Sequence, residues 1–283
     1  MMRHQGYFER FRRIVAEDGM AKAVEQTVDF VQANLGIPSR SARRRIALSK
    51  LISRRLGGVV RYGPFAGLKI RLEATWGAGD RAGMLLGLYE KEVVEVVADA
   101  LRERPIFIDI GAADGYYAVG VLKAKLAEHS IAFEMNSKAR GSIAALAALN
   151  DATERLTIHG AAGAGSLAAL ATELSVGSFE RCVVLCDIEG AEAEVLDDQA
   201  LELLSRAVIV IELHRSGMLS ETDVEALLRK RAAGLFDIES FTVGARAPLQ
   251  IPEIAQLSED DQWLICSEGR GYRQTWLVLR PKA

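Results

Sequence analysis

Beginning at residue 105, short apolar runs alternate with longer stretches of helical periodicity, and this alternation constrains the fold more than any other feature. The five runs occupy residues 106–111, 130–135, 156–161, 182–188 and 207–213. Because they are apolar along their whole length, they are typical of parallel strands that are buried on both faces. Strands separated by helices favour an α/β fold with a mostly parallel sheet.

The segments on either side of this central part complete the predicted architecture. Three later runs are further strand candidates, at residues 236–241, 263–266 and 275–280. We expect at least two of them to form an antiparallel edge. Before the central part, residues 42–56 predict a helix, and residues 59–72 alternate around a Gly-Pro turn, which predicts a small β-hairpin. The chain is therefore divided into an N-terminal helical extension, residues 1–58, and a Rossmann-like domain, residues 59–283.

The composition excludes several classes of protein. Of the 283 residues, 49% are hydrophobic and 26% are charged, the balance of a globular protein with a sizeable core. The net charge of −3 argues against binding of polyanions through overall charge. We expect a cytoplasmic protein, because no apolar run reaches the roughly 18 residues of a membrane span and the N-terminus lacks a signal-peptide core. Three cysteines do not suggest a disulfide framework.

Residues 40–55 gather basic side chains on one face of the expected helix. Such a face suits an anionic membrane surface or a nucleic acid. It is equally the solvated face of a helix that packs on its own body or on a partner subunit, and the net negative charge of the remaining chain favours packing. Nucleic acid is not an expected partner, because aromatic residues do not alternate with the basic ones. A homo-oligomer formed through the N-terminal helices is left open.

A turn rich in small residues, DIGAADG at 109–115, follows the first parallel strand. Gly111 and Gly115 allow the backbone to approach a bound molecule, and the next helix offers free N–H groups. Ligands of such sheets collect at the carboxyl ends of the strands. The dinucleotide fingerprint G-x-G-x-x-G is absent, because Ala113 holds the second glycine position. The charge of Asp109 would repel a pyrophosphate but suits the ammonium group of an aminoacyl ligand.

The second parallel strand ends in Glu134. A carboxylate at that place can accept hydrogen bonds from both hydroxyls of a ribose. Since several adenosine-containing ligands are bound in this way, Glu134 predicts a ribose without identifying the cofactor. The alternative is that Glu134 only caps the following helix.

Four segments between about residues 85 and 215 together resemble one family. GLYEKEVVEVV, IFIDIGAADGYYAVGVL, CDIEGAEAEVL and IVIELH are similar to the FkbM-like branch of class I S-adenosylmethionine-dependent methyltransferases. The resemblance implies a Rossmann-like methyltransferase sheet with S-adenosylmethionine as the cofactor. One departure is Asp114, where this branch often has a neutral residue such as Asn. Residues 1–80 and the C-terminal third match no motif of the family.

The resemblance also implies roles for individual residues. The methionine part of the cofactor is expected at the turn, the ribose at the strand-end acid, the adenine after the third strand and the transferring methyl group after the fourth. The residues are, in that order, Asp109, Gly111, Ala113 and Gly115, then Glu134, then Ala161 and Ala162, and then Asp187.

Methyl transfer to a hydroxyl requires that the acceptor is aligned and loses its proton. If the strand order is as expected, five residues converge at one end of the sheet: Asp187, Glu189, Glu192, Glu212 and His214. His214 is a natural general base, because the unperturbed pKa of histidine lies near neutrality. Two carboxylates could instead hold a divalent metal that lowers the pKa of the hydroxyl. For Glu189 and Glu192 the alternative is a purely structural role, because acids are favoured in the first turn of a helix.

These predictions combine into one functional hypothesis. We expect a methyltransferase that uses S-adenosylmethionine and acts on a small-molecule acceptor, a hydroxyl of a sugar or another small metabolite. The preference for oxygen rests on the resemblance alone. The alternatives are a nicotinamide-dependent oxidoreductase, against which the incomplete glycine fingerprint argues, and a catalytically silent scaffold that binds cofactor or partner. The presence of Asp109, Glu134 and Asp187 argues against the scaffold.

Overall fold

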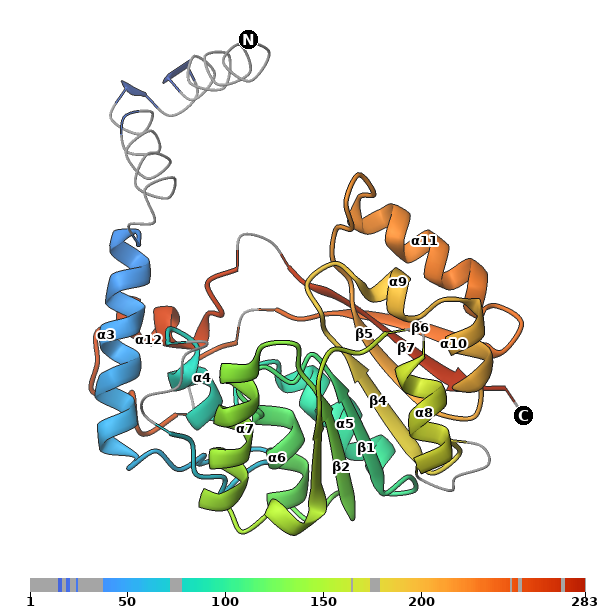
Figure 1. The fold of residues 1–283 in the computed structure, drawn as a ribbon. Coiled ribbons are helices and arrows are strands. Elements are labelled where there is room, and N and C mark those ends of the chain that lie inside the picture. Colours follow the sequence, from blue (N-terminus) through green and yellow to red (C-terminus); the bar gives the residue numbers. More distant parts are fainter. Residues whose placement is uncertain are drawn as a thin grey trace. The chain divides into compact units, whose positions relative to one another are not determined.

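Figure 1 shows the computed structural model of the chain as a ribbon. It describes residues 15–16, 19–20, 24, 38–71, 78–163, 165–173, 179–244, 246–248, 251–270 and 273–282. Residues 1–14 and 25–37 of the predicted extension lie outside this described part, and the boundary predicted at residue 58 stays a prediction. The chain divides into two compact units, Met1–Ala47 and Leu48–Ala283, and the second unit contains the whole sheet.

A seven-stranded mixed sheet forms the centre of the second unit, with the strand order β3-β2-β1-β4-β5-β7-β6. The strands from β3 to β5 pair in parallel, whereas β7 is antiparallel to both β5 and β6. The predicted α/β class, the parallel part and the antiparallel edge are therefore confirmed. The strands are β1 (Ile106–Ile110), β2 (His129–Phe133), β3 (Leu156–His159), β4 (Cys182–Cys186), β5 (Val208–Glu212), β6 (Phe236–Thr242) and β7 (Thr275–Pro281).

Helices cover both faces of this sheet, which is why its central strands β1, β4 and β5 are buried at every position (Figure 1). In β1, Phe107 packs into one buried cluster, while Ile108 and Ile110 pack into the other. Burying each such side chain contributes about 1.5–3 kcal/mol. The first cluster includes side chains of α5 (Lys91–Leu101), α6 (Tyr116–Lys123) and α7 (Ser137–Leu149), and the second includes those of α8 (Ser166–Glu173), α10 (Asp198–Leu203) and α11 (Glu221–Ala232). Shorter elements are α4 (Arg81–Leu85), the 3-10 helix η1 (Thr153–Arg155) and α9 (Glu192–Val195).

The prediction of a strand at residues 263–266 is wrong, because this run lies in a helix, α12 (Glu259–Cys266). Ser258 caps that helix, and its Oγ accepts a hydrogen bond from the backbone N–H of Asp261 at 3.3 Å. Acidic residues fill the first turn, where the helix dipole favours them. A four-residue apolar run fits either structure, so the serine cap and the acids before it were the stronger signal.

Of the hairpin predicted over residues 59–72, the described part to residue 71 contains a single antiparallel bridge, between Val59 and Lys69. Backbone hydrogen bonds flank this bridge, from Val60 N–H to the carbonyl of Leu68 at 2.8 Å and from Ile70 N–H to the carbonyl of Gly58 at 2.7 Å. The backbone groups of Lys69 point away from Val59 and pair with the side chain of Asn150, the C-cap of α7: its N–H donates to Asn150 Oδ1 at 2.8 Å, and Asn150 Nδ2 donates to its carbonyl at 2.9 Å. These bonds attach the short hairpin to the end of α7.

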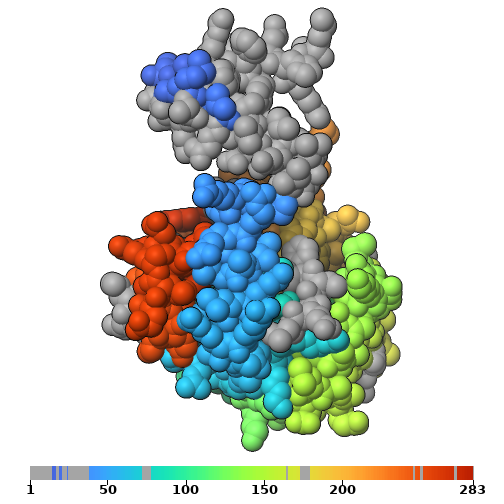
Figure 2. Space-filling view, turned by 90° about the vertical axis from the view of Figure 1, so that its left-hand side faces the viewer, coloured from blue at the N-terminus to red at the C-terminus, as the bar shows by residue number. Residues whose placement is uncertain are grey.

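The helix predicted at residues 42–56 is confirmed as α3 (Arg40–Arg55). Leu48 and Ile52 are buried in a small apolar cluster that also contains Ile265 of α12. Figures 1 and 2 both show this end of α3 beside the C-terminal part of the chain. From Leu48 onward, the packing interpretation of the helix therefore holds, while basic residues such as Arg54 remain exposed. Among the helices of the described residues, none has the length and apolar character needed to cross a membrane.

Candidate active site

The glycine turn after β1 forms at the predicted place. Gly111 and Gly115 have φ angles of 97° and 89°, in the region that favours glycine. A Cβ at Gly111 would meet the carbonyl oxygen of Asp187 at 1.8 Å, so only glycine allows the turn to lie against the end of β4. Gly115 begins α6 without a side-chain cap. In the first turn of α6, the backbone of Ala118 bonds to the carboxyl group of Asp109.

A cavity of about 330 Å³ opens beside this turn. Four of the predicted site residues line it: Asp109, Gly111, Ala113 and Asp187. Aromatic side chains form part of the remaining lining, and the ring of Tyr116 packs edge-on against that of Tyr89, with centroids 5.8 Å apart. The cavity therefore combines an apolar, aromatic surface with a few carboxylates, as small-molecule sites generally do.

Two of the predicted residues that line this cavity are carboxylates, and Asp109 is the more deeply buried of them, with 2% of its surface exposed. Burial raises its pKa to about 8, and the negative charge of Asp187 adds to the shift. Its Oδ2 atom receives no hydrogen bond from any of the described residues. A buried carboxylate of this kind is stabilised by a ligand that brings a positive charge.

Glu134 braces the turn through backbone hydrogen bonds. Its Oε2 accepts from the N–H of Ala113 at 2.9 Å, and its Oε1 accepts from the N–H of Asn136 at 2.7 Å. The cap of α7 is Asn136, whose side chain accepts from Lys138 N and Ala139 N. Asn136, and not Glu134, therefore caps α7, so the alternative role of Glu134 as a helix cap is wrong. Its ribose-binding role stays a prediction.

Ala161 and Ala162 follow β3, next to the end of β2. The ring of Phe133 in β2 stacks on that of His159 in β3, with centroids 4.9 Å apart. The N–H of Glu134 donates to the carbonyl of His159 at 3.3 Å, so the strand-end acid and the β3 turn are neighbours. Neither alanine lines the 330 Å³ cavity. Their contact with an adenine stays a prediction.

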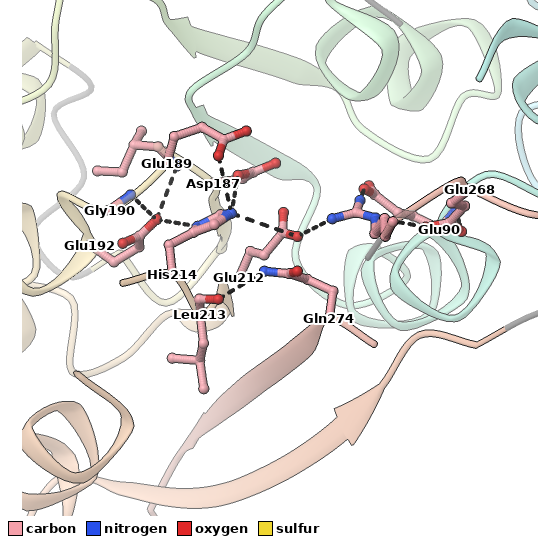
Figure 3. A network of polar contacts seen from close by, with 12 residues as sticks. Glu90, Asp187, Glu189, Gly190, Glu192, Glu212, Leu213, His214, Glu268 and Gln274 are labelled. Carbon is pink, nitrogen blue, oxygen red and sulfur yellow. Dashed lines mark hydrogen bonds and ion pairs between the residues drawn. The ribbon is translucent and has the colours of Figure 1, made fainter. Parts of the chain in front are cut away.

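His214 lies at the centre of a second polar group, which Figure 3 shows in detail. Its Nδ1 is 2.7 Å from Oε1 of Glu192, a residue with no exposed surface. Its Nε2 faces three more carboxylates: Glu189 at 3.5 Å, Glu212 at 3.8 Å and Asp187 at 4.0 Å. The prediction that Asp187, Glu189, Glu192, Glu212 and His214 converge is confirmed.

This group is here called the His214 cluster and consists of Asp187, Glu189, Glu192, Glu212 and His214. The pKa values of Asp187 and Glu212 shift in the opposite direction to that of Glu192. Burial raises the pKa of Glu212, and the charge of Asp187 adds to it. Burial also raises the pKa of Asp187. Burial alone would raise the pKa of Glu192, but the hydrogen bond from His214 lowers it overall. Burial alone would lower the pKa of His214, but Glu192 raises it overall, which makes the imidazole a stronger base.

Two residues of this region were not predicted from the sequence, Glu90 and Arg270. Glu90 is 1% exposed and accepts a hydrogen bond from the hydroxyl of Tyr117 at 2.8 Å. Arg270 donates to Glu212 Oε1 at 2.6 Å, to Glu268 Oε2 at 3.0 Å and also to Glu90. The segment GLYEKEVVEVV contains Glu90 and could have singled it out. No sequence signal marks Arg270, because it lies outside every matched motif.

The His214 cluster also fits a divalent metal ion. One ligand atom each from Asp187, Glu212 and His214 lies within 4.8 Å of the others. Glu192 at Nδ1 leaves Nε2 as the ligating nitrogen, and Arg270 orients Glu212, as outer partners of metal ligands commonly do. This donor set suits a transition metal or zinc. The predicted metal alternative therefore remains open on geometry.

The fold defines a class of protein. A sheet of order 3-2-1-4-5-7-6 with β7 antiparallel is the class I methyltransferase-like α/β fold, and the N-terminal helix precedes it. No protein-family model matches the sequence, and no curated protein sequence matches it.

Solved structures with a similar fold are distant in sequence. An O-methyltransferase from Bacillus cereus in complex with SAH is 10% identical over 90% of this chain and 97% of that chain, with a TM-score of 0.46. A putative tRNA (m1A22) methyltransferase from Streptococcus pneumoniae, in complex with S-adenosyl-L-methionine, is 17% identical over 67% of this chain and 72% of that chain, with a TM-score of 0.43. An uncharacterized protein from Listeria monocytogenes is 16% identical over 66% of each chain, with a TM-score of 0.42. At these identities, the residues of the site must support any functional interpretation.

Proposed function

We propose that this chain is an S-adenosylmethionine-dependent methyltransferase of the FkbM-like type. One observation carries the proposal: Asp187 belongs to both parts of the site. It lines the cavity beside Gly111, and its Oδ1 is 4.0 Å from Nε2 of His214. A small molecule in the cavity would therefore lie next to a group that can accept a proton, as methyl transfer to a hydroxyl requires.

The cavity side is suited to the cofactor. The buried carboxylate of Asp109 matches an ammonium group, since charge-assisted hydrogen bonds are strongest where water is excluded. Glu134 is the proposed partner of the ribose hydroxyls, and Ala161 and Ala162 are the proposed contacts of the adenine. When bound, the cofactor supplies the activated methyl group, and the protein supplies orientation and electrostatics.

The cluster side is suited to the acceptor, for which we propose a hydroxyl of a sugar or another small metabolite. The resemblance to the FkbM-like branch supports oxygen as the nucleophile. His214 is the proposed proton acceptor, because Glu192 occupies Nδ1 and leaves Nε2 toward Asp187 and Glu212. A metal ion on the same atoms would be an alternative way to activate the hydroxyl. We favour His214, because its Nε2 lies 4.0 Å from Oδ1 of Asp187, which lines the cavity.

Isothermal titration calorimetry tests the cofactor assignment without knowledge of the acceptor. We expect binding of S-adenosylhomocysteine and much weaker binding of NAD and NADP. Asp109→Asn, which keeps the shape and removes the charge, should weaken binding of S-adenosylhomocysteine about 10-fold or more. Asp99→Asn on the exposed face of α5 is the control and should bind normally.

Two outcomes of this titration contradict the proposal. Comparable or tighter binding of a nicotinamide cofactor would support the oxidoreductase alternative. An unchanged affinity in Asp109→Asn would remove Asp109 from the cofactor site.

A further inference from the structure

The cavity beside the glycine turn is lined by basic as well as acidic side chains. The acidic side chains include Glu90 and Asp109, and the basic ones are Arg71, Arg81 and Lys138. Arg81 is buried, with 7% of its surface exposed, whereas Arg71 and Lys138 are exposed. A buried guanidinium is costly unless anions compensate its charge. Arg81 is thus the basic residue of the cavity whose guanidinium group is least screened by water.

Local structure holds Arg81 at this position. Ser49, which is 1% exposed, donates its hydroxyl to the carbonyl of Gly79 at 2.7 Å and accepts from the N–H of Ala82 at 3.3 Å. The two hydrogen bonds fix the backbone on both sides of Arg81, the first residue of α4. A residue whose backbone is preorganised in this way loses little freedom when it binds a ligand.

Asp114 already acts on Arg81. Burial lowers the pKa of Arg81, and the negative charge of Asp114 opposes that shift. Asp114 is also the position at which the turn departs from the FkbM-like pattern, so this departure helps to keep the cavity arginine charged. A guanidinium has five N–H donors, which is enough to bind a second carboxylate together with the first.

We propose that Arg81 binds the α-carboxylate of the cofactor's amino-acid end, in the same cavity in which Asp109 receives its ammonium group. This inference rests on the proposed function, because S-adenosylmethionine carries both charges on neighbouring atoms. A zwitterion of that kind needs one cation and one anion within a single small cavity. Arg81 and Asp109 supply them from α4 and from β1, and both are almost fully buried.

Two ligands that differ only in this carboxylate test the assignment: S-adenosylhomocysteine and its decarboxylated analogue, which keeps the ammonium group. By calorimetry, the wild-type protein should bind the first about 10- to 100-fold more tightly. Arg81→Met retains the aliphatic stem of the side chain and should lose most of that preference. Its affinity for the analogue should stay unchanged. Arg81→Lys should restore part of the preference, because it restores the charge without the planar fork.

Lys138→Met is the matched control, because Lys138 lines the same cavity but is exposed, and it should keep the preference. An Arg81→Met protein that still prefers S-adenosylhomocysteine as strongly as the wild type overturns the assignment. So does one that is folded by thermal melting and loses both ligands equally. If Arg81→Met does not fold, Arg81→Lys decides the question in the same way. If the wild-type protein binds neither ligand, the proposed function itself fails. That result differs from an Arg81→Met protein that keeps its preference for S-adenosylhomocysteine, which overturns only the role of Arg81.

Discussion

The cavity and the His214 cluster, the two halves of the site, treat buried carboxylates differently. In the cavity, Oδ2 of Asp109 receives no hydrogen bond from the described residues. In the cluster, Glu192 is paired with His214 and Glu212 is paired with Arg270, although Oδ1 of Asp187 and Oε2 of Glu192 also lack a hydrogen bond from the described residues. The two regions thus differ in their cations: protein cations face the carboxylates of the cluster, whereas the ion pairs of the described residues include none with Asp109. The cavity is therefore suited to a ligand that brings a cation. Ligand affinity should depend on the first region and proton transfer on the second.

The largest effect is expected from His214→Gln, which removes the proposed base from the cluster. Methyl transfer from radiolabelled S-adenosylmethionine to a pool of small hydroxyl acceptors should fall on the order of 100-fold or more, the usual contribution of general acid–base catalysis. Binding of S-adenosylhomocysteine should change little, because His214 does not line the cavity. The matched control is His129→Gln. That histidine lies at the start of β2, and its Nε2 is 2.9 Å from Oγ1 of Thr157.

Two results would break this separation of the two regions. Full activity in His214→Gln would mean that the acceptor is activated elsewhere. Activity that requires Mn²⁺ or Mg²⁺, is abolished by a chelator and is lost in Asp187→Asn would assign the metal role to the same atoms.

A smaller effect is expected from the linkage of cofactor binding to the titration of Asp109. Because its pKa is raised to about 8, this carboxyl is mostly protonated at pH 7, and the ammonium group of a ligand should expel the proton. Calorimetry of S-adenosylhomocysteine in buffers of different ionisation enthalpy should therefore detect proton release at pH 7. The release should disappear in Asp109→Asn and also above about pH 9.

The same shift predicts the stability of the ligand-free protein. A carboxyl whose pKa is raised on folding stabilises the protein fully below its unfolded pKa, near 3.9, and this contribution is lost as the pH rises through about 8. Urea unfolding should therefore show a loss of stability on approaching pH 8, and the loss should be smaller in Asp109→Asn. Equal pH dependence in both proteins would show that Asp109 is not the group that titrates.

The parallel part of the sheet was predictable because apolar residues fill nearly every position of its strands. The runs at 106–111 and 182–188 are apolar on both faces, and only a strand covered on two sides has that pattern. The run at 263–266 was misassigned, because four apolar residues carry no period and the cap at Ser258 was not weighed. The bonds between Lys69 and Asn150, the C-cap of α7, are tertiary contacts that no local pattern contains.

Within the site, residues at strand ends were predictable, and residues that reach across loops were not. Asp109 and Asp187 follow neighbouring parallel strands, whose carboxyl ends meet at one edge. Glu192 was expected at the same end of the sheet, but the helix dipole explained it equally well, so its direct contact with His214 was not predictable. That contact depends on Gly190, where a Cβ would meet the carbonyl of Arg215 at 2.4 Å. The close approach of two loops is a tertiary contact, and no local sequence pattern predicts it.

The smallest effect is expected from Glu192→Gln, which keeps the hydrogen bond to Nδ1 of His214 but removes the charge. The pKa of His214, followed by NMR, should fall, though only in part, because Asp187, Glu189 and Glu212 still face Nε2. In the wild-type protein, the raised pKa of His214 gives stability that is complete below the unfolded value near 6.5 and is lost as the pH rises through the folded value. This loss should shrink in the variant, while affinity for S-adenosylhomocysteine stays unchanged. An unaltered His214 pKa would mean that the three other carboxylates set it, and Glu192 would then be a purely structural residue of α9.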